Sequence, residues 1–277
     1  MSISTELLAA ARQIDDALGA PPVAGIHIPR YQKNPERDAE FCAVRLADGA
    51  VGTAYVMLED TLERIQERRG GDPVSALGLA RGFVDGDAVD RALGLAAINA
   101  LSQSLFRRAG FTPDVATNSL GSLDLGPGDH LGMIGLFRPL VERVRAQGIP
   151  LLVVELKAEL VQEQPGFSVT LDAAQLARCN KIVSTSTVLL NDSLDRILDQ
   201  ARHAEQFVII GPSAGCVPDP LFARGVTAVG GLLVTDTEAF MRRAAAAESW
   251  GDATRKYHIA RDGYPGLSRL IQRAAAV

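Results

Sequence analysis

Cysteine is scarce in this sequence. The three cysteines, Cys42, Cys179 and Cys216, are far apart and form no C-x-x-C pair. An odd number of widely separated cysteines argues against a disulfide framework and against a zinc site with the usual short ligand spacing. The four histidines are scattered too, and none belongs to an H-x-x-x-H or H-E-x-x-H pattern. We therefore expect reduced core thiols, and the spacing predicts no metal ligand.

Long runs of one charge and long apolar runs are also missing. The 28 basic and 33 acidic residues are mixed along the chain, giving a net charge of -5, which argues against nucleic acid as a partner. No apolar stretch reaches the roughly 18 residues that a membrane-spanning helix needs. The first 16 residues have the pattern of an amphipathic helix that carries acids, unlike a signal peptide. We expect a cytoplasmic protein that binds neither nucleic acid nor membrane.

Residues 1–115 are predicted to form a small α+β domain. A helix over residues 4–18 has Ser4 or Thr5 as its cap and Gly19 as its stop. A short strand at residues 23–28 comes next. These elements should pack on a small sheet.

A hairpin and a long helix complete this first part. The strands at 40–46 and 51–58 are joined across Asp48-Gly49, a dipeptide suited to the positive φ of a tight turn. Asp87 opens a helix that runs to about Arg107, and its apolar residues recur at spacings of three and four. We expect this helix to bury one stripe.

Residues 116–277 are predicted to form a Rossmann-like domain with a parallel sheet. Residues 111–130, rich in Gly, Pro, Asp and Ser, are interpreted as the linker. Continuous apolar runs then alternate with helical patterns, which predicts a sheet covered on both faces. The runs lie at residues 131–137, 151–155, 181–186, 207–211 and 227–236, and the helical patterns at 139–148, 172–179, 191–201 and 237–247.

The ends of these runs are where a doubly wound sheet binds its ligand. Gly135 and Glu155 are separated by the roughly 20 residues found between a nucleotide-binding glycine turn and the acid that binds ribose hydroxyls. The turn is not G-x-G-x-x-G, so an adenosyl ligand such as S-adenosylmethionine fits better than NAD. Phe137 lies where it could contact a sulfonium. Alternatively, Glu155 is a solvated acid at a strand end.

Hydroxyl and small residues follow the later runs. They could bind a carboxylate or a ribose. Alternatively, they could only form hydrogen bonds with main-chain groups where the chain turns into a helix. Asn99, in the long helix, could face the sheet domain, where a structural hydrogen bond is the alternative to a ligand contact. These further candidate contacts are Thr185, Ser186, Thr187, Asn191, Gly211, Pro212, Ser213 and Asn99.

Several segments of the second part resemble one known family. IVSTSTVLLNDSLDRIL, VIIGPSAGCVPDPLFARGVTAVGGLLVTD, MIGLFRPLV and LLVVELK are similar to the family named for putative heavy-metal chelation, over most of residues 120–250. GLAAINAL at residues 94–101 resembles its companion N-terminal domain, which implies an enolase N-terminal-like fold. The resemblance implies a site in the cleft between the two parts, with metal handling proposed for the family. Cys216 is the one cysteine in the segments that match, whereas a soft metal ion is bound by several thiolates at once.

Two functions of different class remain open. The first is an enzyme, a transferase or cyclase, that binds S-adenosylmethionine and makes or modifies a metal-chelating metabolite. The second is a non-catalytic carrier of a divalent heavy metal or a metallophore, with Cys216 or a histidine as a ligand. A small-molecule sensor is a third possibility. A homodimer is also open, because the apolar helices near residues 236–247 and 265–277 fit either the interior or an interface.

Overall fold

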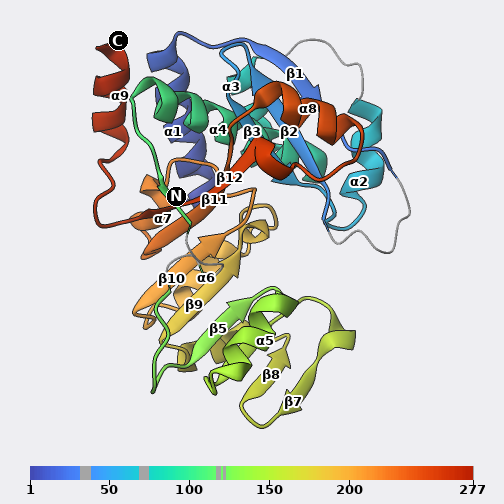
Figure 1. Cartoon of the computed structure of the whole chain (residues 1–277), viewed down its shortest axis with the longest axis vertical. Coiled ribbons are helices and arrows are strands. Elements are labelled where there is room, and N and C mark those ends of the chain that lie inside the picture. Colours follow the sequence, from blue (N-terminus) through green and yellow to red (C-terminus); the bar gives the residue numbers. More distant parts are fainter. Residues whose placement is uncertain (32–38, 69–74, 117–119, 121–122, 277) are drawn as a thin grey trace.

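The computed structural model describes residues 1–31, 39–68, 75–116, 120 and 123–276. It contains a three-stranded sheet and a nine-stranded sheet (Figure 1). The mixed α/β class predicted from the sequence is confirmed. Among the described residues, no helix is long and apolar enough to cross a lipid bilayer.

The small sheet is antiparallel and belongs to the N-terminal part. Its strands, in sheet order, are β1 (Val23–His27), β2 (Phe41–Leu46) and β3 (Val51–Tyr55). The predicted hairpin of β2 and β3 is confirmed, and Gly49 in its turn has a φ of 85°. Alternate strand residues such as Cys42, Val44 and Ala54 are buried in a core shared with the helices.

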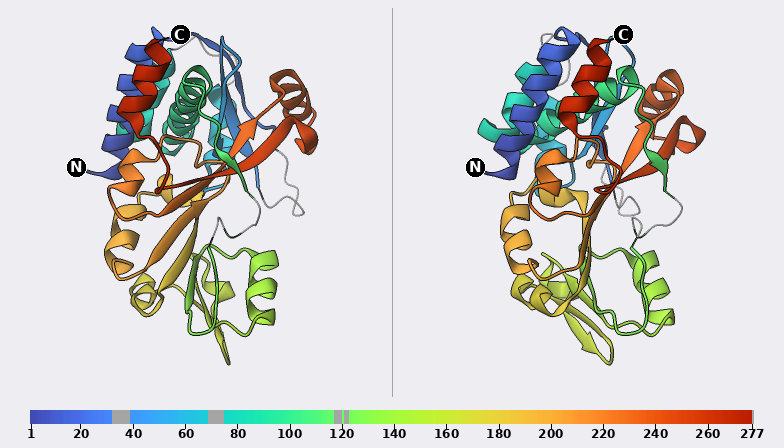
Figure 2. Two further views of the ribbon diagram at one scale, coloured as in Figure 1. Left: turned by 60° about the vertical axis from the view of Figure 1, so that its left-hand side comes forward. Right: turned by 90° about the vertical axis from the view of Figure 1, so that its left-hand side faces the viewer.

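Helices cover one face of this sheet (Figures 1 and 2). They are α1 (Ile3–Leu18), α3 (Ala76–Asp85) and α4 (Ala88–Arg108), with the short α2 (Thr61–Arg64) and the 3-10 helix η1 (Ile65–Arg68) nearby. Helix α1 begins one residue earlier than predicted, because Ser2, not Ser4 or Thr5, is its cap, and it ends at Gly19 with φ 73°. Asp87 caps α4 through two main-chain N–H groups, as predicted.

Helix α4 lies in the middle of the molecule. Its residues from Ala92 to Phe106 are buried on every side, so the expectation of a single buried stripe is wrong. The reason is that α4 packs against the small sheet, α1, α3 and the C-terminal part at once. Gly52 of β3 lies so close that a Cβ there would come within 2.1 Å of the Ala96 carbonyl oxygen. The contact leaves room for glycine only.

The large sheet has six parallel strands at its centre. In sheet order its strands are β4 (Asp114–Val115), β12 (Thr254–Ala260), β11 (Ala228–Val234), β10 (Gln206–Ile210), β9 (Lys181–Thr185), β5 (Leu131–Ile134), β6 (Leu151–Val154), β8 (Phe167–Thr170) and β7 (Gln162–Gln164). The predicted parallel sheet is confirmed by the pairings from β8 to β11. Counted along the chain, these strands run 3-2-1-4-5-6 across the sheet, the order of dinucleotide-binding folds. The sequence patterns missed β4, β7, β8 and β12.

Short helices join successive strands of this part, and one further helix follows the last strand. They are α5 (Arg138–Ala146), η2 (Ala158–Leu160), η3 (Ala173–Arg178), η4 (Ser186–Leu189), α6 (Leu194–Gln200), α7 (Asp219–Phe222), α8 (Thr237–Ala245), η5 (Gly251–Ala253) and α9 (Leu267–Ala275). The helix expected at residues 172–179 is present as the 3-10 helix η3 and not as an α-helix. The helix expected at 191–201 begins only at Leu194, because Asp192 has a φ of 52° that no α-helix accommodates.

The two parts of the chain interlock rather than sitting side by side. Strands β11 and β12 extend past β10 and carry α8 onto the outer face of the small sheet, where Phe240 and Val234 pack on Val51. Residues of the segment interpreted as a linker are also packed in, since Phe111 contacts Tyr264 and β4 pairs with β12. Residues 117–119, 121 and 122 of that segment lie outside the described residues. The predicted domain boundary between residues 115 and 116 stays a prediction.

Candidate ligand-binding site

The strand order changes direction between β5 and β9, which makes the carboxyl ends of these two strands a topological switch point. Among the six parallel strands, β5 comes first in the chain, with β6 on one side of it and β9 on the other. Gly135, directly after β5, has a φ of 84°, and a Cβ there would lie 3.1 Å from Cγ2 of Thr185. The two strand ends therefore approach closely at the place where doubly wound sheets bind ligands.

Glu155, directly after β6, binds the turn that follows Gly135. One carboxylate oxygen accepts a hydrogen bond from the Leu136 N–H at 2.6 Å, and the other accepts from the Leu156 N–H at 3.0 Å. The Glu155 N–H itself donates to Thr170 at the end of β8. This carboxylate is thus held by the main chain rather than freely solvated. It is half-buried and keeps unused lone pairs.

The hydroxyls after β9 differ in their surroundings. Oγ1 of Thr185 accepts from the Thr187 N–H at 3.4 Å and lies 3.3 Å from the Thr187 hydroxyl. Ser186 between them is buried. Asn191 is exposed, and its Oδ1 accepts from the N–H and hydroxyl of Ser193, which is itself the cap residue of α6. The N-cap of α6 therefore lies two residues after Asn191, where the helical pattern begins in the sequence.

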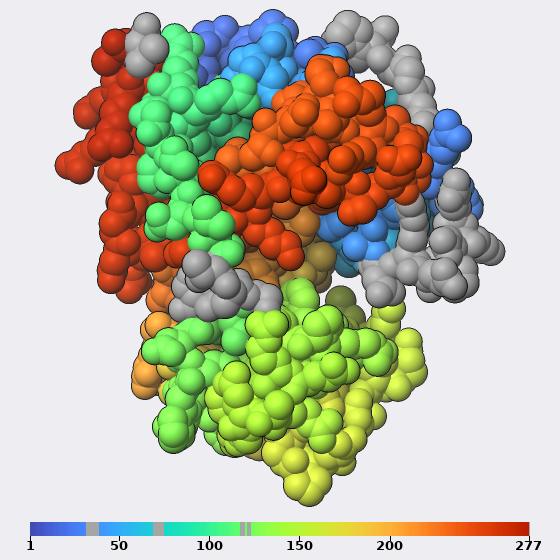
Figure 3. Space-filling model, in the orientation of Figure 1, coloured from blue at the N-terminus to red at the C-terminus, as the bar shows by residue number. Residues whose placement is uncertain are grey.

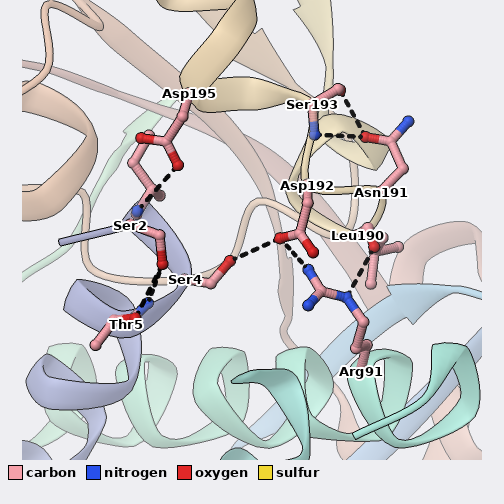
Figure 4. A network of polar contacts seen from close by, with 10 residues as sticks. Ser2, Ser4, Thr5, Arg91, Leu190, Asn191, Asp192, Ser193 and Asp195 are labelled. Atoms are coloured by element: carbon pink, nitrogen blue, oxygen red, sulfur yellow. Dashed lines mark hydrogen bonds and ion pairs between the residues drawn. The ribbon is translucent and has the colours of Figure 1, made fainter. Parts of the chain in front are cut away.

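A network beyond Asn191 ties this loop to the N-terminal helices (Figure 4). The Arg91 side chain donates to Asp192 at 2.6 Å and to the Leu190 carbonyl at 3.0 Å. Asp192 also accepts from Ser4, and Asp195 accepts from the Ile3 N–H at the start of α1. The loop that carries the β9 hydroxyls is consequently fixed at its far end.

The turn after β10 is built into the small sheet. The Pro212 carbonyl accepts from the Thr53 hydroxyl at 2.8 Å, and the Ser213 hydroxyl accepts from the Tyr55 N–H at 2.9 Å. Gly211 precedes them with a φ of 139°. Ser213 is fully buried, so it holds the two sheets together.

Asn99 takes part in the same contact from α4. Its Nδ2 donates to the carbonyls of Thr53 and Ser213 at 2.8 and 2.9 Å, and its buried Oδ1 has no partner among the residues that the structure describes. One turn further, Gln103 donates to the Gly215 carbonyl and the Tyr257 hydroxyl. Asn99 thus faces the C-terminal part as a structural bridge. The sequence analysis missed Gln103, although its spacing of four from Asn99 places both amides on one helix face.

All three cysteine side chains are buried. Burial raises the pKa of the Cys42 and Cys216 thiols to about 12 and that of Cys179 to about 11, so all three stay protonated near neutral pH. Within the described part of the chain, no three His, Cys, Asp or Glu side chains gather in a way that could hold a metal ion.

Two surface hollows lie away from the switch point. One is lined by residues at the amino ends of β6, β8 and β9, among them Leu151, Phe167 and Cys179. The other lies beside α6 and includes Leu198 and Arg224. Ligands of doubly wound sheets bind at the carboxyl ends of the strands, so we place the site at the switch point. There, the segment from β5 to β8 forms a separate lobe of the surface (Figure 3).

Comparison with known proteins now assigns the family. A family model described as "putative heavy-metal chelation" matches residues 118–261, and a second model with the same description matches residues 39–102. The chain belongs to this family. That the N-terminal part has an enolase N-terminal-like fold stays a prediction.

Other members of the family share the fold. A protein of unknown function from Pyrococcus horikoshii has a TM-score of 0.70 and 20% identity, over 92% of this chain and 99% of that one. One from Desulfitobacterium hafniense has a TM-score of 0.62 and 20% identity, over 91% and 98% of the two chains. An uncharacterized protein of Methanocaldococcus jannaschii is 28% identical over 175 residues, or 62% of this chain. The match spans 66% of that relative, just under two thirds of its length.

Proposed function

We propose that the protein binds an adenosyl compound, S-adenosylmethionine in the first instance, at the carboxyl ends of β5, β6 and β9. In this proposal it is a transferase or cyclase that makes or modifies a small metal-chelating metabolite. The observation that carries the proposal is the arrangement of Gly135, Thr185 and Glu155 at the switch point. A close turn and a held carboxylate lie on neighbouring strand ends, as a nucleoside site requires.

The turn after β5 favours a nucleoside without a diphosphate. A diphosphate binds to free N–H groups at a glycine-rich helix start. Here the Leu136 N–H already donates to Glu155, and Phe137 with its bulky side chain occupies the cap of α5. The turn therefore offers few donors to phosphate, while Glu155 still offers acceptors to ribose hydroxyls.

The chelating atoms are assigned to the metabolite rather than to the protein. Soft metals bind to groups of thiolates, and all three thiols of this chain are buried and protonated. The family description concerns heavy-metal chelation, and a chelating product agrees with it. A carrier that uses Cys216 would first have to expose and deprotonate that thiol.

Calorimetric titration with S-adenosylmethionine tests the proposal. Glu155→Gln should weaken binding about 10- to 150-fold, the loss expected when a hydrogen bond to a charged group is removed. Glu142→Gln, at an exposed position on α5, is the matched control and should bind normally. Melting temperatures of both variants show whether the β5 turn stays folded.

Two results would overturn this assignment. The first is equal affinity of wild-type protein and folded Glu155→Gln. The second is a native mass spectrum in which the protein retains a stoichiometric heavy metal, loses it in Cys216→Ser, and shows no adenosyl adduct. That outcome would make the carrier the better description.

A further inference from the structure

Three exposed apolar side chains gather at the carboxyl edge of β6 and β8. Leu156 is 74% exposed, and Leu171 and Val161 are each 51% exposed. They are three of the seven large apolar side chains that are exposed in the described part of the chain, and the other four lie within residues 1–115. Single exposed apolar residues are ordinary, whereas a group of them at one place marks a binding surface.

The register of the sheet brings these three residues together. The last residue of β6 pairs with the last residue of β8, so Leu156 and Leu171 follow the ends of neighbouring strands. The first residue of β7 pairs with the third residue of β8 in the antiparallel sense, so Val161 lies level with the end of β8. Neighbouring strands are about 4.8 Å apart, so the three residues extend over roughly 10 Å of the edge. We call them the apolar row.

Hydrogen-bonded turns carry two members of the row. The Leu156 N–H donates to the Glu155 carboxylate at 3.0 Å. After β8, the Thr170 hydroxyl oxygen accepts from the Asp172 N–H at 3.1 Å, which fixes the turn that contains Leu171. The main chain under both leucines is thus ordered before a ligand arrives, which lowers the entropy cost of binding.

The apolar row begins at the carboxylate that we assign to ribose hydroxyls. Leu156 directly follows Glu155, and from there the row leads away from β5 toward β8 and β7. Thr185, at the end of β9, lies on the other side of β5. The base and the 5′ substituent of a nucleoside leave the ribose on different sides of its ring. A flat purine ring suits apolar side chains, which form most of the lining of small-molecule sites.

The surroundings of the row favour a small ring over a second protein molecule. Exposed charged side chains border it, among them Lys157, Glu159 and Asp172. A stable protein interface buries about 800 Å² on each partner, and its centre is depleted of charged residues. Three side chains bordered by charges are too small a surface for such an interface.

We propose that the apolar row is the subsite for the purine base of the ligand. The ligand then lies across the strand ends, with its base over Leu156 and Leu171, its ribose on Glu155 and its 5′ extension toward Thr185. The inference rests on the proposed function and adds the orientation of the ligand to it. Leu156 and Leu171 become the residues that select for a purine.

Calorimetric titration with methylthioadenosine, an adenine nucleoside with a short 5′ extension, provides the first test. Leu171→Asn replaces an apolar side chain with a polar one of similar size and should weaken binding about 5- to 20-fold. Leu171→Met keeps the surface apolar and should bind about as tightly as the wild type. Val115→Asn, which is equally exposed but lies in the edge strand β4, is the matched control and should bind normally.

All three variants should melt close to the wild-type temperature, because exposed positions contribute little to stability. Nuclear Overhauser effects between methyl-labelled leucines and bound methylthioadenosine provide the second test. Leucine methyl groups should show contacts to H2 and H8 of the adenine ring, and the contacts that disappear in Leu171→Met belong to Leu171.

Three results would overturn the inference. The first is a folded Leu171→Asn that binds methylthioadenosine as tightly as the wild type. The second is a contact from Leu171 to the methylthio group in place of the base, which would reverse the orientation. The third is light scattering that shows a dimeric wild type and a monomeric Leu171→Asn without ligand, since the row would then be a subunit interface.

Failure of the proposed function gives a different pattern. If the wild type binds neither methylthioadenosine nor S-adenosylmethionine, both the adenosyl site and the base subsite fall. If the wild type binds and Glu155→Gln weakens binding, the adenosyl site stands. In that case an unchanged affinity of Leu171→Asn removes only the inference about the apolar row.

Discussion

The two halves of the sheet's carboxyl edge differ in what covers them. At β10 and β11 the edge is buried under α4 and the small sheet, and Asn99, Gln103 and Ser213 connect the layers through neutral hydrogen bonds. At β6 and β8 the edge is open, with Leu156 74% and Leu171 51% exposed. One half thus fixes the N-terminal part in place, and the other remains available to a ligand.

The largest expected effect concerns the buried half. Gly52→Ala would place a Cβ 2.1 Å from the Ala96 carbonyl oxygen and 2.2 Å from the Ala100 nitrogen, so β3 and α4 would have to separate. We expect a loss of about 3 kcal/mol or more in the free energy of unfolding, since main-chain atoms cannot move aside cheaply. Urea unfolding followed by circular dichroism measures it.

Gly25→Ala is the control for that change. Gly25 lies in β1 of the same sheet, and a Cβ there would meet nothing closer than 3.8 Å. Its stability should stay within about 0.5 kcal/mol of the wild type. Equal stability of the two variants would show that α4 and β3 are not in close contact.

A smaller loss is expected from Asn99→Ala. The change leaves the carbonyls of Thr53 and Ser213 without a donor in a buried place, which costs about 2 to 3 kcal/mol. Asn191→Ala, at an exposed asparagine, should cost less than about 1 kcal/mol. If Asn99→Ala instead keeps full stability and loses affinity for S-adenosylmethionine, Asn99 belongs to the ligand site and the division of the edge is wrong.

The parallel sheet was predictable because its signal is local. Continuous apolar runs such as residues 151–155 and 207–211 mark strands buried on both faces, and Gly135 and Glu155 follow two of them directly. Caps were partly predictable for the same reason: Asp87 and Asp236 cap their helices, whereas α1 is capped by Ser2. The sequence therefore located the switch point to within a few residues.

The remaining features depend on contacts between distant segments. Strand β8 alternates buried and half-buried residues and follows the exposed β7, so no continuous apolar run marks it. The all-round burial of α4 follows from its packing against the small sheet, α1, α3 and α9, contacts that no local window contains.

The smallest expected effect concerns the opposite edge of the sheet, where β5 and β9 begin, and it is measured through pH. Asp129, beside β5, accepts from the Gly126 N–H and from Asn180 and pairs with Lys181, and these contacts lower its pKa to about 2. Its pKa in the unfolded chain is about 3.9. The stability it contributes is therefore fully present above about pH 4 and is lost as the pH falls toward 2.

Asp129→Asn should remove that part of the acid sensitivity while costing about 1 kcal/mol at neutral pH. Unfolding free energies measured between pH 5 and 2 should show a shallower slope for Asp129→Asn than for the wild type or for the exposed control Asp262→Asn. The buried half is held by neutral groups such as Asn99 and Gln103, whose hydrogen bonds do not titrate in this range. Equal slopes for Asp129→Asn and the wild type would mean that this ionic contact does not stabilise the start of β5 against the start of β9.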